Sequence, residues 1–442
     1  MKKLSVIVLL SLFIIFSASS TSMVGQTWSG KLIGQLDLIV HFNSETTGTV
    51  DVPQQNTKGL RITYKLEKES LSFKFSDIVA DYEGIVNDNQ INGTFHQNGG
   101  SLPLNFTKQE TSLSSEITIP ENFISEDVQF FNKQAGIFLA GTITRPKDFK
   151  FHTAVILISG SGLQDRDETI LGKRPFYNIS TALSNAGFVV LRFDDRGYGE
   201  SQGDSTNATT EDFATDVSSA VDFLLTKNYV NKKKIGLIGH SEGGIIAPIV
   251  ATQRNDIDFL ILLAGPGVDG KTLILDQSKV MLEKSNVSKD YMDKALEVNE
   301  TIYDTVLNNS LSTDEKKAIM QKLLSDFKME QTAIDANIEA SLSPWYRFFL
   351  ALDPSIYLKQ IKIPVLSLNG TLDTQVTADL NQNGIKKALE QAGNKYYEIK
   401  KLEGYNHLFQ KANTGLVNEY ATLGKAMDDE VCKIIINFIQ KQ

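Results

Sequence analysis

Two patterns of apolar and polar positions divide the chain. From residue 27 to residue 108, short segments alternate apolar and polar side chains, which is the period of a strand with one buried face. Turn-forming residues separate the clearest of these segments, which lie at 36–42, 60–64, 71–75 and 102–106. This region is predicted to form a small all-β domain, either a barrel or a sandwich.

After residue 128, apolar segments alternate with segments of helical period, which is typical of a mostly parallel sheet covered on both faces. Strands are expected at 136–144, 153–159, 188–193, 234–238, 259–264, 364–368 and 396–402. Helices are expected at 175–186, 210–227, 243–252, 377–392 and 428–440. Residues 109–127 would connect the two regions. The predicted fold class is therefore α/β for 128–442, preceded by a small all-β domain at 27–108.

One connection in the α/β region is unusually long. About a hundred residues separate the strands at 259–264 and 364–368, whereas such connections are normally short. Ser312 and Glu315 have the spacing of a helix capping box, and the residues that follow have helical period. A helical cap insertion is predicted at about 268–350. Its aromatic residues Trp345, Tyr346, Phe348 and Phe349 are expected to pack the cap onto the core, with an acyl pocket as the alternative.

The first 22 residues have the composition of a secretion signal. Lys2 and Lys3 precede an apolar run from Leu4 to Phe16, and small residues follow at 17–20. The apolar run is shorter than the ~20 residues that span a bilayer, so we expect no stable membrane anchor. The sequence predicts export to the periplasm or the extracellular space.

Composition narrows the choice of partners. The formal net charge is −9 and there is no long run of Lys or Arg, which argues against a nucleic acid partner, because that binding depends on neutralising phosphates. The single cysteine, Cys432, cannot form an intramolecular disulfide. His41 and His96 have no carboxylate or cysteine at metal-ligand spacing, so no metal site is expected.

The strand at 234–238 runs directly into Gly239-His240-Ser241-Glu242-Gly243 and then into a helix. This strand, sharp turn and helix are what a nucleophile elbow requires, so Ser241 is the predicted nucleophile. A second Gly-x-Ser-x-Gly occurs at 199–203. No strand leads into that copy and no helix follows it, so it is predicted to be a loop.

A serine nucleophile needs a histidine base, and in the α/β-hydrolase arrangement the acid and then the histidine follow the serine along the chain. His407 is the predicted base, because it lies in a loop after the last expected strand. His240 is the neighbour of Ser241 and cannot easily reach its hydroxyl. The remaining histidines precede Ser241, namely His41, His96 and His152.

Asp373 is the predicted acid. It is the first carboxylate after the strand at 364–368, so it can lie at the same sheet edge as Ser241 and His407. Asp353 lies before that strand and Asp379 lies within the next helix, which makes both weaker choices.

The tetrahedral intermediate of acyl transfer needs backbone N–H donors for its oxyanion. The amide of Glu242, next to the nucleophile, is one predicted donor, and the amide of Ser161, in the loop 159–162, is the other. Asp194, Asp195 and Arg196 follow an earlier strand and are interpreted as a structural turn held by ion pairs.

Four motifs together resemble bacterial two-domain serine esterases of the α/β-hydrolase superfamily, which place a lipocalin-like β domain ahead of the hydrolase domain. The motifs lie at 160–167, 195–199, 239–244 and 406–409. The resemblance implies carboxylesterase activity, a triad of Ser241, Asp373 and His407, and no cofactor. Ser159 departs from the wider superfamily, where a histidine often precedes the oxyanion glycine.

Three functions remain open at this point. The first is an exported carboxylesterase that acts on a small-molecule ester. The second is a peptidase like the prolyl oligopeptidase relatives, although these usually carry a large propeller domain that this sequence lacks. The third is a ligand-binding protein with an inactive hydrolase domain, which the complete set of triad residues argues against. The oligomeric state is left open.

Overall fold

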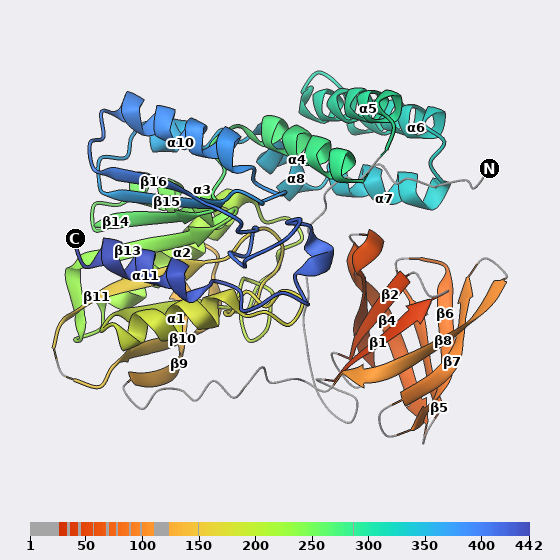
Figure 1. Cartoon of the computed structure of the whole chain (residues 1–442), viewed down its shortest axis with the longest axis horizontal. Helices are drawn as coiled ribbons and strands as arrows, with labels where there is room; N and C mark the ends of the chain where they lie inside the picture. Colours follow the sequence, from red (N-terminus) through yellow and green to blue (C-terminus); the bar gives the residue numbers. More distant parts are fainter. Residues whose placement is uncertain are drawn as a thin grey trace. The chain divides into compact units, whose positions relative to one another are not determined.

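The computed structural model of the protein describes residues 26–109 and 123–442, apart from short gaps at 33–35, 43–45, 56, 68–69, 77, 88–89, 98–99, 149 and 286. These residues form two compact units, divided near residue 118 (Figure 1). The signal segment predicted at 1–22 and most of the connector predicted at 109–127 lie outside the described residues.

The first unit is a closed barrel of eight antiparallel strands. Each strand pairs with the next one, and β1 pairs with β8 to close the barrel, which decides between the barrel and the sandwich. Large side chains such as Trp28, Phe73 and Tyr82 fill the interior and are almost completely buried. The strands are β1 (Thr27–Leu32), β2 (Leu36–Phe42), β3 (Thr47–Val52), β4 (Thr57–Glu67), β5 (Ser70–Phe75), β6 (Ala80–Asn87), β7 (Gln90–Gln97) and β8 (Gly100–Gln109), with a short 3-10 helix η1 (Pro53–Gln55) before β4.

The second unit contains an eight-stranded sheet of order β16-β15-β14-β13-β11-β12-β10-β9. Six strands run parallel, and β10 and β9 add an antiparallel edge. The strands are β9 (Phe123–Asn132), β10 (Ile137–Pro146), β11 (His152–Ile158), β12 (Val189–Phe193), β13 (Val230–His240), β14 (Phe259–Leu263), β15 (Val365–Gly370) and β16 (Tyr397–Leu402). Together with the barrel, this sheet confirms the predicted fold class.

The first strand of the sheet differs from the sequence prediction. β9 begins at Phe123, inside the segment assigned to the connector. Because β9 is the edge strand and pairs only with β10, most of its middle residues stay partly exposed and are polar, as at Ser125, Glu126 and Asp127. The apolar pattern of a buried strand is therefore absent.

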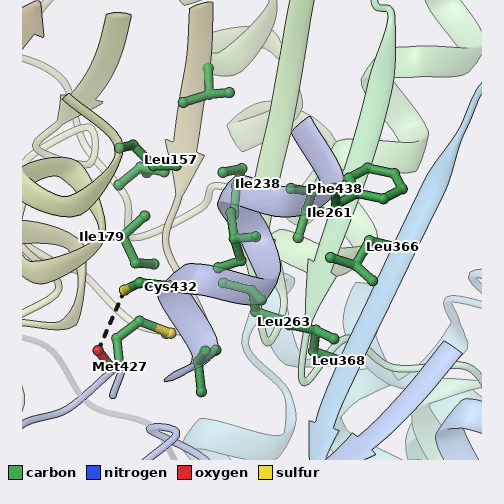
Figure 2. Packing of buried hydrophobic residues seen from close by; sticks show 14 of the residues in the cluster. Leu157, Ile179, Ile238, Ile261, Leu263, Leu366, Leu368, Met427, Cys432 and Phe438 are labelled. Carbon is green, nitrogen blue, oxygen red and sulfur yellow. Dashed lines mark hydrogen bonds between the residues drawn. The ribbon is translucent and has the colours of Figure 1, made fainter. Parts of the chain in front are cut away.

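Helices cover the sheet, and α1 and α11 pack together on one face of it. Figure 2 shows the core on that side, where Ile179 of α1 and Phe438 of α11 meet Leu157, Ile238 and other strand residues. The covering helices are α1 (Pro175–Asn185), α2 (Thr210–Leu225), α3 (Gly243–Gln253), α10 (Ala378–Ala392) and α11 (Asp429–Ile439), and a 3-10 helix η2 (Val417–Glu419) precedes α11.

Cys432 lies within this core. Its thiol donates a hydrogen bond to the Met427 carbonyl at 3.6 Å (Figure 2), and burial raises the pKa of the thiol to about 12. Because the thiolate is the reactive form of cysteine, we assign Cys432 to packing.

The predicted cap is present as a run of helices between β14 and β15 (Figure 1). Ser312 and Glu315 form the predicted capping box at the start of α6. Trp345 stacks on Phe349 at 5.1 Å between ring centroids. The helices are α4 (Gly270–Lys284), α5 (Lys289–Leu307), α6 (Thr313–Asp326), α7 (Gln331–Ser341), α8 (Pro344–Ala351) and α9 (Ser355–Leu358). No helix within the described residues has the length and apolarity of a membrane span.

Candidate active site

Ser241 lies at the tip of the turn between β13 and α3. Its φ of 52° is in the left-handed region, which costs a non-glycine residue of order 1–3 kcal/mol and is common at active sites. The turn is held by hydrogen bonds on both sides: the Ser241 amide donates to the Leu263 carbonyl at 2.9 Å, and the Gly244 amide donates to the Ser241 carbonyl at 2.8 Å. The serine is thus presented by a strained and well-fixed backbone.

The glycines of the motif let this turn pack closely. A Cβ atom at Gly239 would lie 1.9 Å from the Gly243 carbonyl oxygen, and one at Gly243 would lie 2.2 Å from the Ile158 carbonyl oxygen. A Cβ atom at Gly160 would lie 3.0 Å from the Cβ of Ser241. The loop 159–162 therefore lies directly against Ser241.

Asp373 and His407 form a buried hydrogen-bonded pair. Asp373 follows β15 and His407 follows β16, and these strands are neighbours in the sheet. The His407 Nδ1 donates to the Asp373 Oδ2 at 2.7 Å, and the other carboxylate oxygen accepts from the amides of Gln375 at 2.8 Å and Val376 at 2.9 Å. With the proton on Nδ1, Nε2 is the ring atom that can act as a base.

Asn406 shapes the turn that carries His407. Its buried Oδ1 accepts hydrogen bonds from the amides of Leu408 at 3.1 Å and Gln410 at 2.9 Å. Phe409 has a φ of 54°, so this turn also contains a left-handed residue. His407 is therefore held by its own loop as well as by Asp373.

The two predicted oxyanion residues are neighbours. The side chain of Ser161 hydrogen-bonds to the carboxyl group of Glu242, which brings the loop 159–162 to the start of α3. The amide of Gly160 donates to Glu168 Oε1 at 2.8 Å, so that amide is already engaged. The role of the Glu242 and Ser161 amides as oxyanion donors stays a prediction.

The carboxyl group of Glu242 also connects the elbow to the cap. It accepts hydrogen bonds from Thr210 Oγ1 at 2.6 Å and from Trp345 Nε1 at 3.0 Å. Burial raises the pKa of the Glu242 carboxyl, and the hydrogen bonds from Thr210, Ser161 and Trp345 oppose that rise. Trp345 belongs to α8, so the cap is attached beside Ser241 by a hydrogen bond to a buried acid.

Replacing Trp345 with phenylalanine should remove this bond while keeping a ring that can stack on Phe349. Because Glu242 is buried, we expect the free energy of unfolding to fall by about 1–3 kcal/mol, measured by urea denaturation. Tyr357→Phe is a matched control, since it deletes a donor to the exposed Glu211 at 3.4 Å and should change stability by less than about 0.5 kcal/mol. Equal effects of the two variants would mean that the Trp345 bond does not hold the cap.

Ion pairs hold the turn at 194–196, as the sequence had suggested, and they connect it to other segments. Each charged group bonds to another part of the chain: Asp194 pairs with Arg166 and Arg196 pairs with Asp216. Asp195 accepts a hydrogen bond from Ser159 Oγ at 2.7 Å, which supports the loop 159–162 from behind. The turn therefore contributes to the site indirectly.

The second Gly-x-Ser-x-Gly copy has a structural role. Ser201 Oγ donates to the Asp194 carbonyl at 2.7 Å and accepts from the Ala140 amide at 2.9 Å.

Within the described residues, no group of His, Cys, Asp and Glu side chains has an arrangement that could hold a metal ion.

The roles of three residues that surround the site did not emerge from the sequence. Trp345 was expected to pack the cap onto the core or to line an acyl pocket, His240 was considered only as a neighbour of Ser241, and Glu168 was not considered. Glu168 lies immediately after the motif at 160–167 and is completely buried. A carboxylate directly after the glycine-rich motif was the signal available in the sequence.

Comparisons with known proteins show the family of the chain. Residues 174–411, more than half of the chain, match the family model described as serine aminopeptidase, S33. The chain is 26% identical to esterase EstD of Thermotoga maritima over 306 residues, covering 69% of this chain and 65% of that protein. It is 32% identical to an uncharacterised protein of Pseudomonas aeruginosa over 126 residues, covering 28% of this chain and 33% of that protein. The chain thus spans less than two thirds of the length of these curated relatives.

Similar solved structures include an esterase of Pyrococcus furiosus and the uncharacterised Pseudomonas aeruginosa protein. The Pyrococcus furiosus structure is 16% identical with a TM-score of 0.45, covering 72% of this chain and 91% of that chain. The Pseudomonas aeruginosa structure is 18% identical with a TM-score of 0.45, covering 75% of this chain and 97% of that chain.

Proposed function

The chain belongs to the serine aminopeptidase S33 family of α/β-hydrolases, and we propose that it cleaves carboxylic esters of small molecules through an acyl-enzyme on Ser241. The observation that carries the proposal is the buried pair of Asp373 and His407, which lies at the same sheet edge as the strained turn of Ser241. A serine at an elbow, a histidine and an orienting carboxylate are the three parts of a catalytic triad.

The proposed reaction has two steps. In the first, Ser241 Oγ attacks the ester carbonyl while His407 Nε2 takes the hydroxyl proton, and Asp373 stabilises the imidazolium that forms. The amides of Glu242 and Ser161 would bind the oxyanion. The tetrahedral intermediate then loses the alcohol, which receives the proton from His407. In the second step, a water molecule attacks the acyl-enzyme by the same route and releases the acid.

Ester and amide substrates are both consistent with this machinery. The name of the family favours a peptidase acting on N-terminal residues, whereas the Thermotoga maritima relative is an esterase. We favour the ester, because that relative is similar to this chain over 306 residues. The intact Asp373–His407 pair also favours an active hydrolase over a protein that only binds a ligand.

A substrate screen distinguishes an esterase from a peptidase. The purified protein should hydrolyse chromogenic esters of graded acyl length, and Ser241→Ala should not. Aminoacyl amides, assayed beside the esters, should be cleaved more slowly. Rapid cleavage of the amides without any cleavage of the esters would establish the peptidase instead.

We also propose that the protein is exported, on the basis of the sequence of residues 1–22. Cell fractionation should recover it outside the cytoplasm, and N-terminal sequencing of the recovered protein should begin after residue 17. A cytoplasmic protein that retains Met1 would contradict this proposal.

A further inference from the structure

His240, the residue before the nucleophile, lies between two loops of the site. Its Nδ1 is 2.8 Å from Glu168 Oε1, and its Nε2 is 2.9 Å from the backbone carbonyl oxygen of His407. Its ring is 4.7 Å from the ring of His407, measured between centroids. His240 and Glu168 are 1% and 0% exposed, so neither group exchanges its partner for water.

The partners of His240 define where its protons lie. A carbonyl oxygen can only accept a hydrogen bond, so Nε2 must carry a proton. Nδ1 faces a carboxyl oxygen, and imidazole holds a proton more strongly than a carboxylate does, with ordinary pKa values of about 6.5 and 4.3. The arrangement therefore favours a ring with protons on both nitrogens, next to an ionised Glu168.

The charged groups around the ring support this assignment. Burial by itself would lower the pKa of His240, but the Glu168 carboxylate, the hydrogen bond to the His407 carbonyl and the Asp373 carboxylate together raise it above its ordinary value. The ring of Phe409 is the uncharged neighbour, at 6.4 Å between centroids. An imidazolium in this place is thus balanced by two carboxylates.

Glu168 makes a second connection, to the loop that lies against Ser241. The same Oε1 atom accepts a hydrogen bond from the Gly160 amide at 2.8 Å. Glu168 has a φ of 52°, a conformation that a non-glycine residue keeps only when its surroundings hold it there. Its Oε2 has no hydrogen-bond partner among the described residues, so the bonds through Oε1 are what compensate its burial.

We propose that His240 and Glu168 are positioning residues, and that their buried ion pair holds the loop 159–162 and the His407 loop in a fixed arrangement around Ser241. Glu168 fixes the first loop through Gly160. His240 fixes the second loop through the carbonyl of His407, and it is attached to the nucleophile by a peptide bond. One ion pair therefore sets the relative placement of the nucleophile, the base and the predicted oxyanion donor Ser161.

This inference rests on the proposed function, but it can fail separately. If the wild-type protein neither cleaves esters nor reacts with a fluorophosphonate probe, the proposed function fails. If the wild-type protein does both and the variants below behave like it, only the positioning role fails.

The first test is the protonation state of His240. In protein labelled with ¹⁵N-histidine, NMR at pH 7 should show one buried ring with a proton on each nitrogen, and His240→Gln should remove that signal. Glu168→Gln should leave this ring with a single proton, because a buried cation without its counter-ion loses its charge. If His240→Gln does not fold, the spectral change caused by Glu168→Gln identifies the ring. A His240 ring with one proton in the wild-type protein would overturn the proposal.

The second test is kinetic. Glu168→Gln should lower kcat for ester hydrolysis by on the order of 10²-fold, as small misplacements of catalytic groups do, with KM nearly unchanged. Asp167→Asn is the matched control, since the neighbouring Asp167 is also buried and pairs with Arg192 and Arg174. That variant should lose stability while its folded fraction keeps a kcat close to wild type. An equal loss of kcat in both variants would show that only the stability of the loop matters.

The ion pair also predicts a dependence of stability on pH. Because the pKa of His240 is raised on folding, its contribution to stability is complete below the ordinary value and is lost as the pH rises through the folded-state pKa. The difference in unfolding free energy between wild type and Glu168→Gln should therefore shrink at alkaline pH. A difference that grows with pH would contradict a charged His240.

Discussion

Replacing Ser241 with alanine should lower kcat by on the order of 10⁶, the loss seen when a serine nucleophile is removed from a complete triad. The substitution removes only the hydroxyl group. The backbone amide at position 241 keeps its hydrogen bond to the Leu263 carbonyl. The variant should therefore fold like wild type. The measurement is ester turnover together with labelling by a fluorophosphonate probe.

Ser201→Ala is the control for this result, because Ser201 occupies the other Gly-x-Ser-x-Gly motif. Its hydroxyl bonds to the backbone carbonyl of Asp194 and the backbone amide of Ala140, so its loss should cost about 1–3 kcal/mol of stability by leaving the buried Ala140 amide unpaired. The folded fraction should keep its kcat. Probe labelling that persists in Ser241→Ala would contradict the assignment of the nucleophile.

The parts of the site that follow from local geometry could be predicted from sequence. The elbow requires glycines at fixed positions beside Ser241, and the structure shows the contacts that exclude a side chain there. Asp373 and His407 were found because the ends of neighbouring parallel strands meet at one sheet edge. These inferences need only strand positions and chain order.

The parts that depend on contacts between distant segments could not be predicted. Glu168 and His240 are hydrogen-bonded although they are 72 residues apart in the sequence, and Trp345 and Glu242 are hydrogen-bonded although they are 103 residues apart. No spacing rule connects such pairs, because each depends on how the loop after β11 and the cap helix α8 pack onto the elbow. The closure of the barrel could not be predicted for the same reason, since it depends on the pairing of β1 with the distant β8.

A charged His240 also bears on how the pH dependence of the enzyme should be interpreted. Burial opposes ionisation of this ring, but the Glu168 carboxylate, the hydrogen bond to the His407 carbonyl and the Asp373 carboxylate raise the pKa of His240 above its ordinary value. The titration of His240 should therefore be detected at alkaline pH, as a change in the free energy of unfolding. The acid limb of the pH–activity profile should then report the ionisation of one group, His407.

The second large effect concerns His407 and Asp373. In the wild-type enzyme, kcat/KM should rise with pH through one ionisation, because only a neutral His407 can accept the serine proton. Asp373→Asn should keep the fold but lower kcat by on the order of 10⁴, since an amide can hold the ring in the wrong tautomer. His407→Ala should abolish nearly all activity together with the acid limb. Initial rates across the pH range, measured on variants checked for folding, test all three expectations.

Asp379→Asn provides the matched control for the acid. Asp379 lies on α10, within six residues of Asp373, but its carboxylate is exposed and pairs with Lys401, so its loss should leave both kcat and the pH profile unchanged. The Asp373 carboxylate instead bonds to Nδ1 of His407 and to two backbone amides, so its charge and its geometry act directly on the base. If His407→Ala kept ester turnover with the same acid limb, the proton would have to go to another group, and the assignment of Ser241, Asp373 and His407 as a triad would be withdrawn.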